Sequence, residues 1–200
     1  MNHFNITNAW ITSVLGVAEQ DPNVLDNIFD VIKDSEKTAC LIRIVRNTNN
    51  ANILNKTINL VSTLDSDTEK MQVLTEVYKM PILDTQCISN VLQIINKIKL
   101  RNQTFHASSR YDKIFEGLSE NLNTSSEDLT TIYNNYASKK ILTNANIDAA
   151  LITRIYREKE YDLTTKDIRI LCSHPNVPFF LLEKIYDSSP QEIKDIILER

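Results

Sequence analysis

The residues best suited to specific contacts form a basic stretch in the middle of the chain. Its cations are opposed only by Asp112, and its aromatic rings are interleaved with them. The residues concerned are Lys97, Lys99, Arg101, Phe105, His106, Arg110, Tyr111 and Lys113. Basic side chains neutralise phosphates, and aromatic rings offer faces for unpaired bases. The pattern predicts contact with nucleic acid or with an acidic protein surface. The simpler interpretation is a solvated helix end followed by a polar loop.

Candidate catalytic and metal-ligating residues are scattered. His3, His106 and His174 are far apart, and no H-x-x-x-H, C-x-x-C or H-E-x-x-H pattern occurs. Cys172 and Ser173 stand too near His174 in the chain to face it as nucleophile and base. The two glycines of the whole sequence form no phosphate-binding loop. We therefore expect no enzyme, with no catalytic, cofactor or metal site, and we interpret His174 as a structural residue in a turn between helices.

The composition fits an ordinary globular protein in a reducing compartment. The chain of 200 residues is 42% hydrophobic, with a net charge of −4. This charge gives no general attraction to nucleic acid or to an anionic membrane. Cys40, Cys87 and Cys172 are odd in number and lie in apolar contexts, which indicates reduced core thiols. No signal peptide or membrane span is recognisable, so we expect a cytoplasmic protein.

The elements that position these residues follow from an internal repeat. Six anchor residues share the same apolar surroundings: Asn23, Asn52, Gln86, Asn123, Asn146 and Asn176. The sixth residue after each anchor is apolar: Phe29, Ile58, Leu92, Leu129, Ile152 and Leu182. So is the ninth: Ile32, Val61, Ile95, Ile132, Ile155 and Ile185. Positions three apart share one helical face. Each anchor marks a turn, because Asn bonds nearby backbone groups.

An apolar-periodic run also precedes each anchor, so every unit reads as helix, short turn, helix. One such pair cannot bury its apolar face, whereas stacked pairs can. The sequence predicts an all-α fold, an α-solenoid of about six degenerate helix-turn-helix repeats, in a single domain spanning 1–200. We expect eleven to thirteen short helices, the first beginning near Asn8 and capped by it. The longest interval between anchors contains 97–113, which could be an irregular insertion.

The last repeat carries a family resemblance. The stretch DIRILCSHPNVPFFLLEKIYD, 167–187, resembles HEAT-like repeats and the related leucine-rich variant repeat. Asp167, Ile168 and Arg169 match the start of the repeat, and His174, Pro175 and Asn176 match its turn; Leu181, Leu182 and Ile185 match its second helix. The other copies keep less of the pattern, and all but the first lack the Pro-Asn turn. The resemblance implies a binding scaffold without attached chemistry.

Three tyrosines follow the ninth position in the C-terminal half. Tyr133, Tyr156 and Tyr186 each stand directly after an Ile. The simpler interpretation packs these rings between helices with the hydroxyl at the surface. The alternative is a row of tyrosines that binds a partner along one face.

The function expected from these features is a non-enzymatic protein-interaction scaffold. The low glycine content, the abundance of Asn, Ile and Lys and the small size suit a viral or phage accessory protein that binds and modulates a host protein in the host cytoplasm. The first alternative is a helical-repeat nucleic-acid-binding protein that uses the basic 97–113 segment. A homo-oligomer in which repeat faces pair is a further alternative.

The register of the repeat can be tested at Leu182. If the sixth position is core, Leu182→Ala lowers the free energy of unfolding by about 2–5 kcal/mol. Chemical denaturation measures this change, and an unchanged midpoint would contradict the register.

Overall fold

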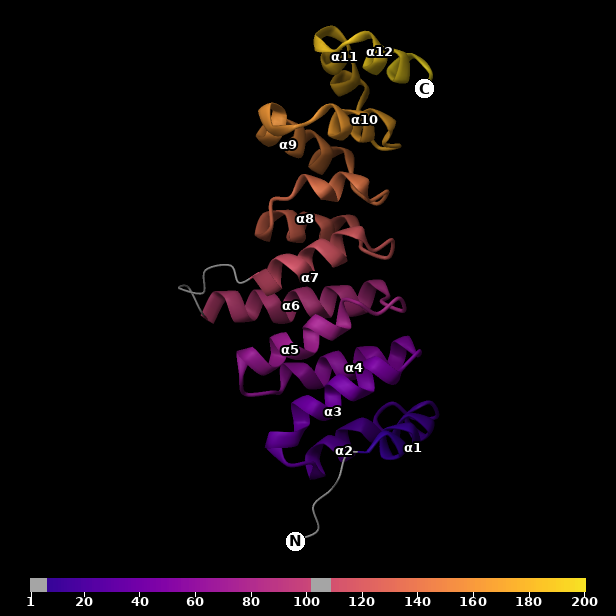
Figure 1. Ribbon diagram of the computed structural model, residues 1–200, viewed down its shortest axis with the longest axis vertical. Coiled ribbons are helices and arrows are strands. Elements are labelled where there is room, and N and C mark those ends of the chain that lie inside the picture. Colours follow the sequence, from indigo (N-terminus) through magenta and orange to yellow (C-terminus); the bar gives the residue numbers. More distant parts are fainter. Residues whose placement is uncertain (1–6, 102–108) are drawn as a thin grey trace. The chain divides into compact units, whose positions relative to one another are not determined.

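The structure, a computed structural model, describes residues 7–101 and 109–200, and Figure 1 shows them as helices joined by short connections. Over these residues there are twelve α-helices, two short 3-10 helices and no strand. The chain divides into two compact units, residues 1–117 and residues 118–200. Phe105 and His106 lie outside the described residues, and so does the side chain of Arg110. The all-α prediction and the expected number of helices are confirmed.

The first unit is built from helix pairs in which each helix also packs on the next but one. The contacts α1 with α3, α3 with α5, α2 with α4 and α4 with α6 follow this rule. The helices are α1 (Asn8–Ala18), α2 (Val24–Val31), α3 (Asp34–Asn47), α4 (Ala51–Ser62), α5 (Asp67–Val77), α6 (Thr85–Arg101) and most of α7 (Ser109–Glu120). The predicted insertion thus begins inside α6 and reaches into α7.

The second unit continues the alternation with shorter elements. They are α8 (Ser126–Asn135), η1 (Lys139–Thr143), α9 (Ala149–Lys159), η2 (Glu160–Asp162), α10 (Thr165–Ser173), α11 (Phe179–Ser188) and α12 (Gln191–Leu198). Here α10 packs on η1 and on α12, and α9 packs on η1.

The six repeats of the sequence coincide with six pairs of elements. Each anchor lies at the turn that separates the members of a pair, or at the start of the second helix. All twelve side chains at the sixth and ninth positions are buried, from Ile58 and Ile152, which are inaccessible, to Leu182, which is 7% exposed. The pattern in the sequence therefore gives the core face correctly in every copy.

The fifth pair departs from the prediction of two α-helices. Its first member is the single 3-10 segment η1, because only 23 residues separate Asn123 from Asn146. Ser138 caps this segment by accepting a hydrogen bond from the Lys140 N–H. It stands eight residues before the anchor, where the other five copies carry Leu15, Ile44, Tyr78, Phe115 and Ile168. The shortest interval thus removes most of a helix and keeps the turns on either side.

The first helix begins at Asn8, as predicted, but its cap is different. The side chain of Thr7 accepts the hydrogen bond from the Trp10 N–H, and Thr7 has the extended backbone of a cap residue. The expectation that Asn8 caps the helix is wrong, because Asn8 already has helical geometry. The last helix ends at Leu198.

The turns are closed by a residue that stands two places before the anchor. In all six copies this residue is Asp, Asn or His: Asp21, Asn50, Asp84, Asn121, Asn144 and His174. In five copies its side chain accepts from the anchor N–H, at 2.9–3.1 Å. In the Gln86 copy Asp84 Oδ1 accepts from the Cys87 N–H instead, at 2.7 Å. The sequence interpretation expected the anchor's own side chain to bond nearby backbone groups; within each turn, this hydrogen bond is made by the residue two places earlier.

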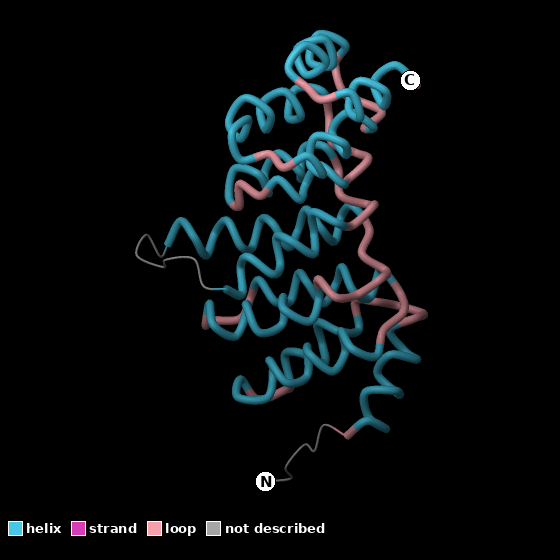
Figure 2. Tube along the Cα trace, turned by 45° about the horizontal axis from the view of Figure 1, so that its top comes forward, coloured by secondary structure: helices cyan, strands magenta, loops and turns pink. Residues whose placement is uncertain are grey.

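Figure 2 draws the connections between helices as pink segments, and in the second unit anchor side chains join two of these turns to the preceding one. The Asn146 amide nitrogen donates to the carbonyls of Leu122 and Thr124, at 2.6 and 3.0 Å. The Asn176 amide nitrogen repeats this geometry on the carbonyls of Ala145 and Ile147, at 3.3 and 2.8 Å. Each amide thus spans the residues on both sides of the previous anchor.

A second line of hydrogen bonds runs through the residues that close these turns. The amide of Asn144 donates to the Asn121 carbonyl at 2.8 Å, and His174 Nε2 lies 3.0 Å from the Asn144 carbonyl. Because His174 Nδ1 accepts from the Asn176 N–H, Nε2 carries the proton and donates. Arg200 Nη2 then donates to the His174 carbonyl at 2.9 Å. We name both lines together the turn ladder.

The turn ladder gives a test of anchor function. Asn146→Ala and Asn176→Ala should each lower the free energy of unfolding by about 1–2 kcal/mol, because two carbonyls lose their donor. Asn52→Ala is the control, since the Asn52 side chain is exposed and makes no such bridge; we expect a change within about 0.5 kcal/mol. Urea denaturation measures all three, and equal effects at Asn52 and Asn176 would contradict the ladder.

Gly117 lies against the ring of Tyr78, and this contact can be tested with the other glycine of the chain. A Cβ at Gly117 would stand 2.5 Å from the Tyr78 ring, whereas a Cβ at Gly16 would meet nothing. Gly117→Ala should therefore cost about 1–3 kcal/mol through overpacking. Gly16→Ala should add roughly 0.5–1 kcal/mol, because alanine favours a helix. Thermal and urea unfolding measure the stability of both variants against the wild type. If both substitutions stabilise the protein, the close packing of Gly117 on Tyr78 is disproved.

Candidate functional site

One surface site in the second unit is a groove between α11 and α12. It has a volume of about 570 Å³ and carries Phe179, Leu182 and Tyr186 from α11 and Ile197 and Leu198 from α12. Phe179 is 73% exposed and Leu198 is 68% exposed. Exposed apolar patches of this kind are a common feature of surfaces through which proteins contact other molecules.

Local sequence explains why these side chains face outward. Pro178 precedes the first residue of α11, and Pro190 precedes the first residue of α12, so both helices begin at a fixed point. Leu181, Ile185 and Ile193 supply the buried contacts of the two helices. Phe179 and Leu198 lie outside that buried stripe, and their side chains line the groove.

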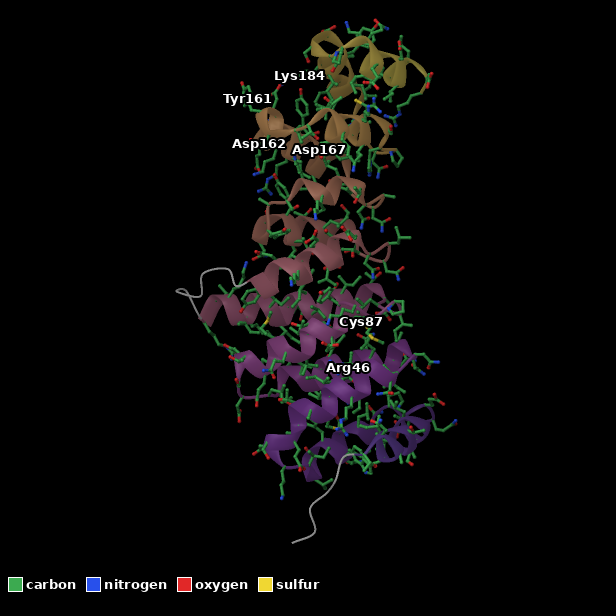
Figure 3. All side chains as sticks on the ribbon, in the orientation of Figure 1. Arg46, Cys87, Tyr161, Asp162, Asp167 and Lys184 are labelled. Atoms are coloured by element: carbon green, nitrogen blue, oxygen red, sulfur yellow. The ribbon has the colours of Figure 1, made fainter. Side chains whose placement is uncertain are left out.

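The rim of the groove is acidic. Glu183 and Asp187, one turn apart on α11, both line it. Over the described part of the chain neither carboxylate has an ion-pair partner. The cation between them, Lys184, contacts a different element: it lies 3.0 Å from Glu160 and 4.9 Å from the centre of the Tyr156 ring. The labelled Lys184 in Figure 3 lies near the segment that holds Tyr161 and Asp162.

The three tyrosines that follow Ile residues share one packing motif. A cation from a later helix lies over each ring: Arg154 over Tyr133, Lys184 over Tyr156 and Lys194 over Tyr186, at 4.9–5.1 Å. Tyr133 is 1% exposed and Tyr156 is 6% exposed. Of the three, only the half-buried Tyr186 lines the groove.

The hydroxyls of the two buried tyrosines reach surface carboxylates. Tyr133 donates to Glu158 at 2.9 Å, and Tyr156 donates to Glu160 at 3.1 Å. Burial, followed by these hydrogen bonds, raises the pKa of each tyrosine to about 12. Both tyrosines therefore pack between helices with the hydroxyl toward the surface, and a partner would reach Tyr186 first.

The basic stretch is divided by the fold. Lys97 and Lys113 are exposed, whereas Lys99 lies 5.1 Å from the centre of the Phe115 ring, and burial lowers its pKa. Tyr111 is 2% exposed, so its ring offers no face for stacking. Arg101 instead points toward Asp67, with Nη1 3.9 Å from Oδ1.

Lys97 and Arg101 do lie close together, beside a third residue that the sequence did not indicate. They line a small pocket with Lys70 of α5. The spacing of four residues places Lys97 and Arg101 on one face of α6, and this signal is visible in the sequence. The sequence interpretation missed Lys70, which approaches them only through the packing of α5 on α6.

The cysteines and His174 take structural positions. All three cysteines are free and buried, and burial raises the pKa of Cys40 and Cys172 to about 11 and that of Cys87 to about 12. Cys87, labelled in Figure 3, belongs to the first unit. Both ring nitrogens of His174 are engaged in the turn ladder. Within residues 7–101 and 109–200, no three His, Cys, Asp or Glu side chains are grouped to hold a metal ion.

Comparison of the sequence and structure with known proteins found no relative: no protein-family model, no curated protein and no solved structure matches this chain. Among the described helices, none combines the length and apolarity that crossing a membrane requires.

Proposed function

We propose that this protein is a non-enzymatic scaffold, an α-solenoid of six degenerate HEAT-like repeats that binds another protein through the groove between α11 and α12. The observation that carries the proposal is the exposed pair Phe179 and Leu198 beside the rim carboxylates Glu183 and Asp187. Support for the repeat architecture comes from the buried sixth and ninth positions and, in the second unit, from the turn ladder. The composition adds a second part to this proposal: the protein is a viral or phage accessory protein that acts on a host protein.

The chemistry of the groove defines the partner segment. An amphipathic helix can place apolar residues spaced three and four apart into such a groove. The unpaired carboxylates of Glu183 and Asp187 favour Lys or Arg beside those apolar anchors. The occupant is therefore a basic amphipathic helix of another protein.

A second copy of the chain fits the groove less well. In a two-fold symmetric pair the same patch meets itself. Glu183 and Asp187 would then face their own counterparts across an apolar contact, where like charges repel. Charge complementarity thus supports a foreign basic segment over self-association.

The nucleic-acid alternative retains weaker support. It rests on the exposed Lys97 and Lys113. Tyr111 is buried and Lys99 is engaged with Phe115, which removes one predicted stacking ring and one predicted phosphate contact.

The groove can be tested by selecting helical peptides from a random display library on the full chain. We expect the selected peptides to carry apolar residues at helical spacing flanked by Lys or Arg. The double variant Phe179→Ser with Leu198→Ser should weaken their binding by more than about tenfold, because exposed apolar anchors carry most of such an interface. Phe180→Ser is the matched control, since Phe180 is 57% exposed but does not line the groove.

Two results would contradict the proposal. One is selection of peptides without basic residues, or of peptides that bind the double variant and the wild type equally. The other is concentration-dependent sedimentation of the wild type that the double variant abolishes, which would make a second copy the occupant.

A further inference from the structure

A small pocket of the first unit is lined by three cations, and one carboxylate, Asp67, lies near two of them. It has a volume of about 110 Å³ and lies where α4, α5 and α6 meet. Lys70 comes from α5, and Lys97 and Arg101 come from α6; Ser62, Ile94 and Ile98 complete the lining. Figure 1 shows these three helices as neighbours. This pocket is separate in sequence and in unit from the groove of α11 and α12.

Lys70 is the least expected member of this pocket. It is 5% exposed, and burying an ammonium group is costly unless close partners compensate for the lost water. Its carboxylate neighbour is Asp67, with Nζ and Oδ1 3.7 Å apart. That separation exceeds the 2.7–2.9 Å of a charge-assisted hydrogen bond. Asp67 therefore compensates Lys70 only in part.

The same carboxylate oxygen also serves a second cation. Arg101 Nη1 lies 3.9 Å from Asp67 Oδ1, again longer than a direct hydrogen bond. Lys97, one turn before Arg101 on α6, adds a third positive charge to the lining. Asp67 thus lies near two of the three cations, and the lining of the pocket keeps an excess of positive charge.

We propose that this pocket binds a phosphate group, either inorganic phosphate or the terminal phosphate of a monoester. A tetrahedral oxyanion with close to two negative charges balances the excess. The Arg101 guanidinium can donate two parallel hydrogen bonds to it, and the two lysines act as point charges. The apolar walls of Ile94 and Ile98 lower the local dielectric and strengthen this attraction.

The size of the pocket favours a single terminal group over a polymer backbone. A volume of about 110 Å³ holds a few water molecules, each of which occupies roughly 30 Å³. A phosphate with its oxygens fits such a space. A phosphodiester strand continues on both sides and is better served by an open groove lined with stacking aromatic rings.

Isothermal titration calorimetry on the full chain at fixed ionic strength tests the site. The probes are inorganic phosphate, phosphoserine and one single-stranded oligonucleotide with and without a 5′-phosphate. Lys97→Gln and Arg101→Gln should each weaken phosphate or phosphoserine binding by about tenfold, the loss of one charge-assisted contact. Lys113→Gln removes one equally exposed cation outside the pocket and should leave binding unchanged. Circular dichroism checks that each variant folds.

The relative affinities identify the source of the phosphate. Tighter binding of phosphoserine and of the 5′-phosphorylated oligonucleotide indicates a monoester, whereas tighter binding of inorganic phosphate indicates the free ion. The proposal is overturned if no probe gives a saturable signal, or if Lys113→Gln weakens binding as much as Arg101→Gln. It is also overturned if the oligonucleotide binds equally with and without its 5′-phosphate, which would identify the basic stretch as a surface for nucleic-acid backbone.

Discussion

The second unit depends on how its turns satisfy their own backbone. A tight connection between helices leaves N–H and C=O groups without helical partners, and these groups are costly when buried unpaired. A side chain two places before each anchor accepts one N–H, as Asn144 and His174 do. The anchor amide of the next turn then covers carbonyls of the previous one, as Asn176 does for Ala145 and Ile147. The residues that close a turn therefore also link it to the preceding turn, through separate hydrogen bonds.

Once the turns are fixed, the helices between them have little freedom in how they pack. The sixth and ninth positions after each anchor are buried in all six copies, and in the second unit cations from later helices lie over the rings of Tyr133, Tyr156 and Tyr186. The interval between turns can vary, since the fifth copy replaces a helix with the 3-10 segment η1 and still keeps its turn. Degenerate repeats of unequal length are compatible with this arrangement, because the hydrogen-bonded turns, and not the lengths of the helices, fix how successive pairs stack.

The side chains left over from core and turns form two surfaces of opposite chemistry. Phe179 and Leu198 make an apolar groove with an acidic rim, which suits a basic amphipathic segment. Lys70, Lys97 and Arg101 make a small cationic pocket, which suits a phosphate group. The two surfaces belong to different units of the chain. If both proposals hold, the protein recognises a protein segment and a phosphate at independent surfaces.

The sequence by itself determined the helical class, the turns and the core face, because these follow from local periodicity and from turn residues near in the chain. It also contained the residue two places before each anchor, a signal that was present and overlooked. Only tertiary structure decided the rest. Lys99 was drawn to Phe115 and Tyr111 was buried, which no local pattern shows, because burial depends on which helices pack together. Lys70 joined Lys97 and Arg101 for the same reason: charges distant in the chain become a site only when packing places them on one cavity.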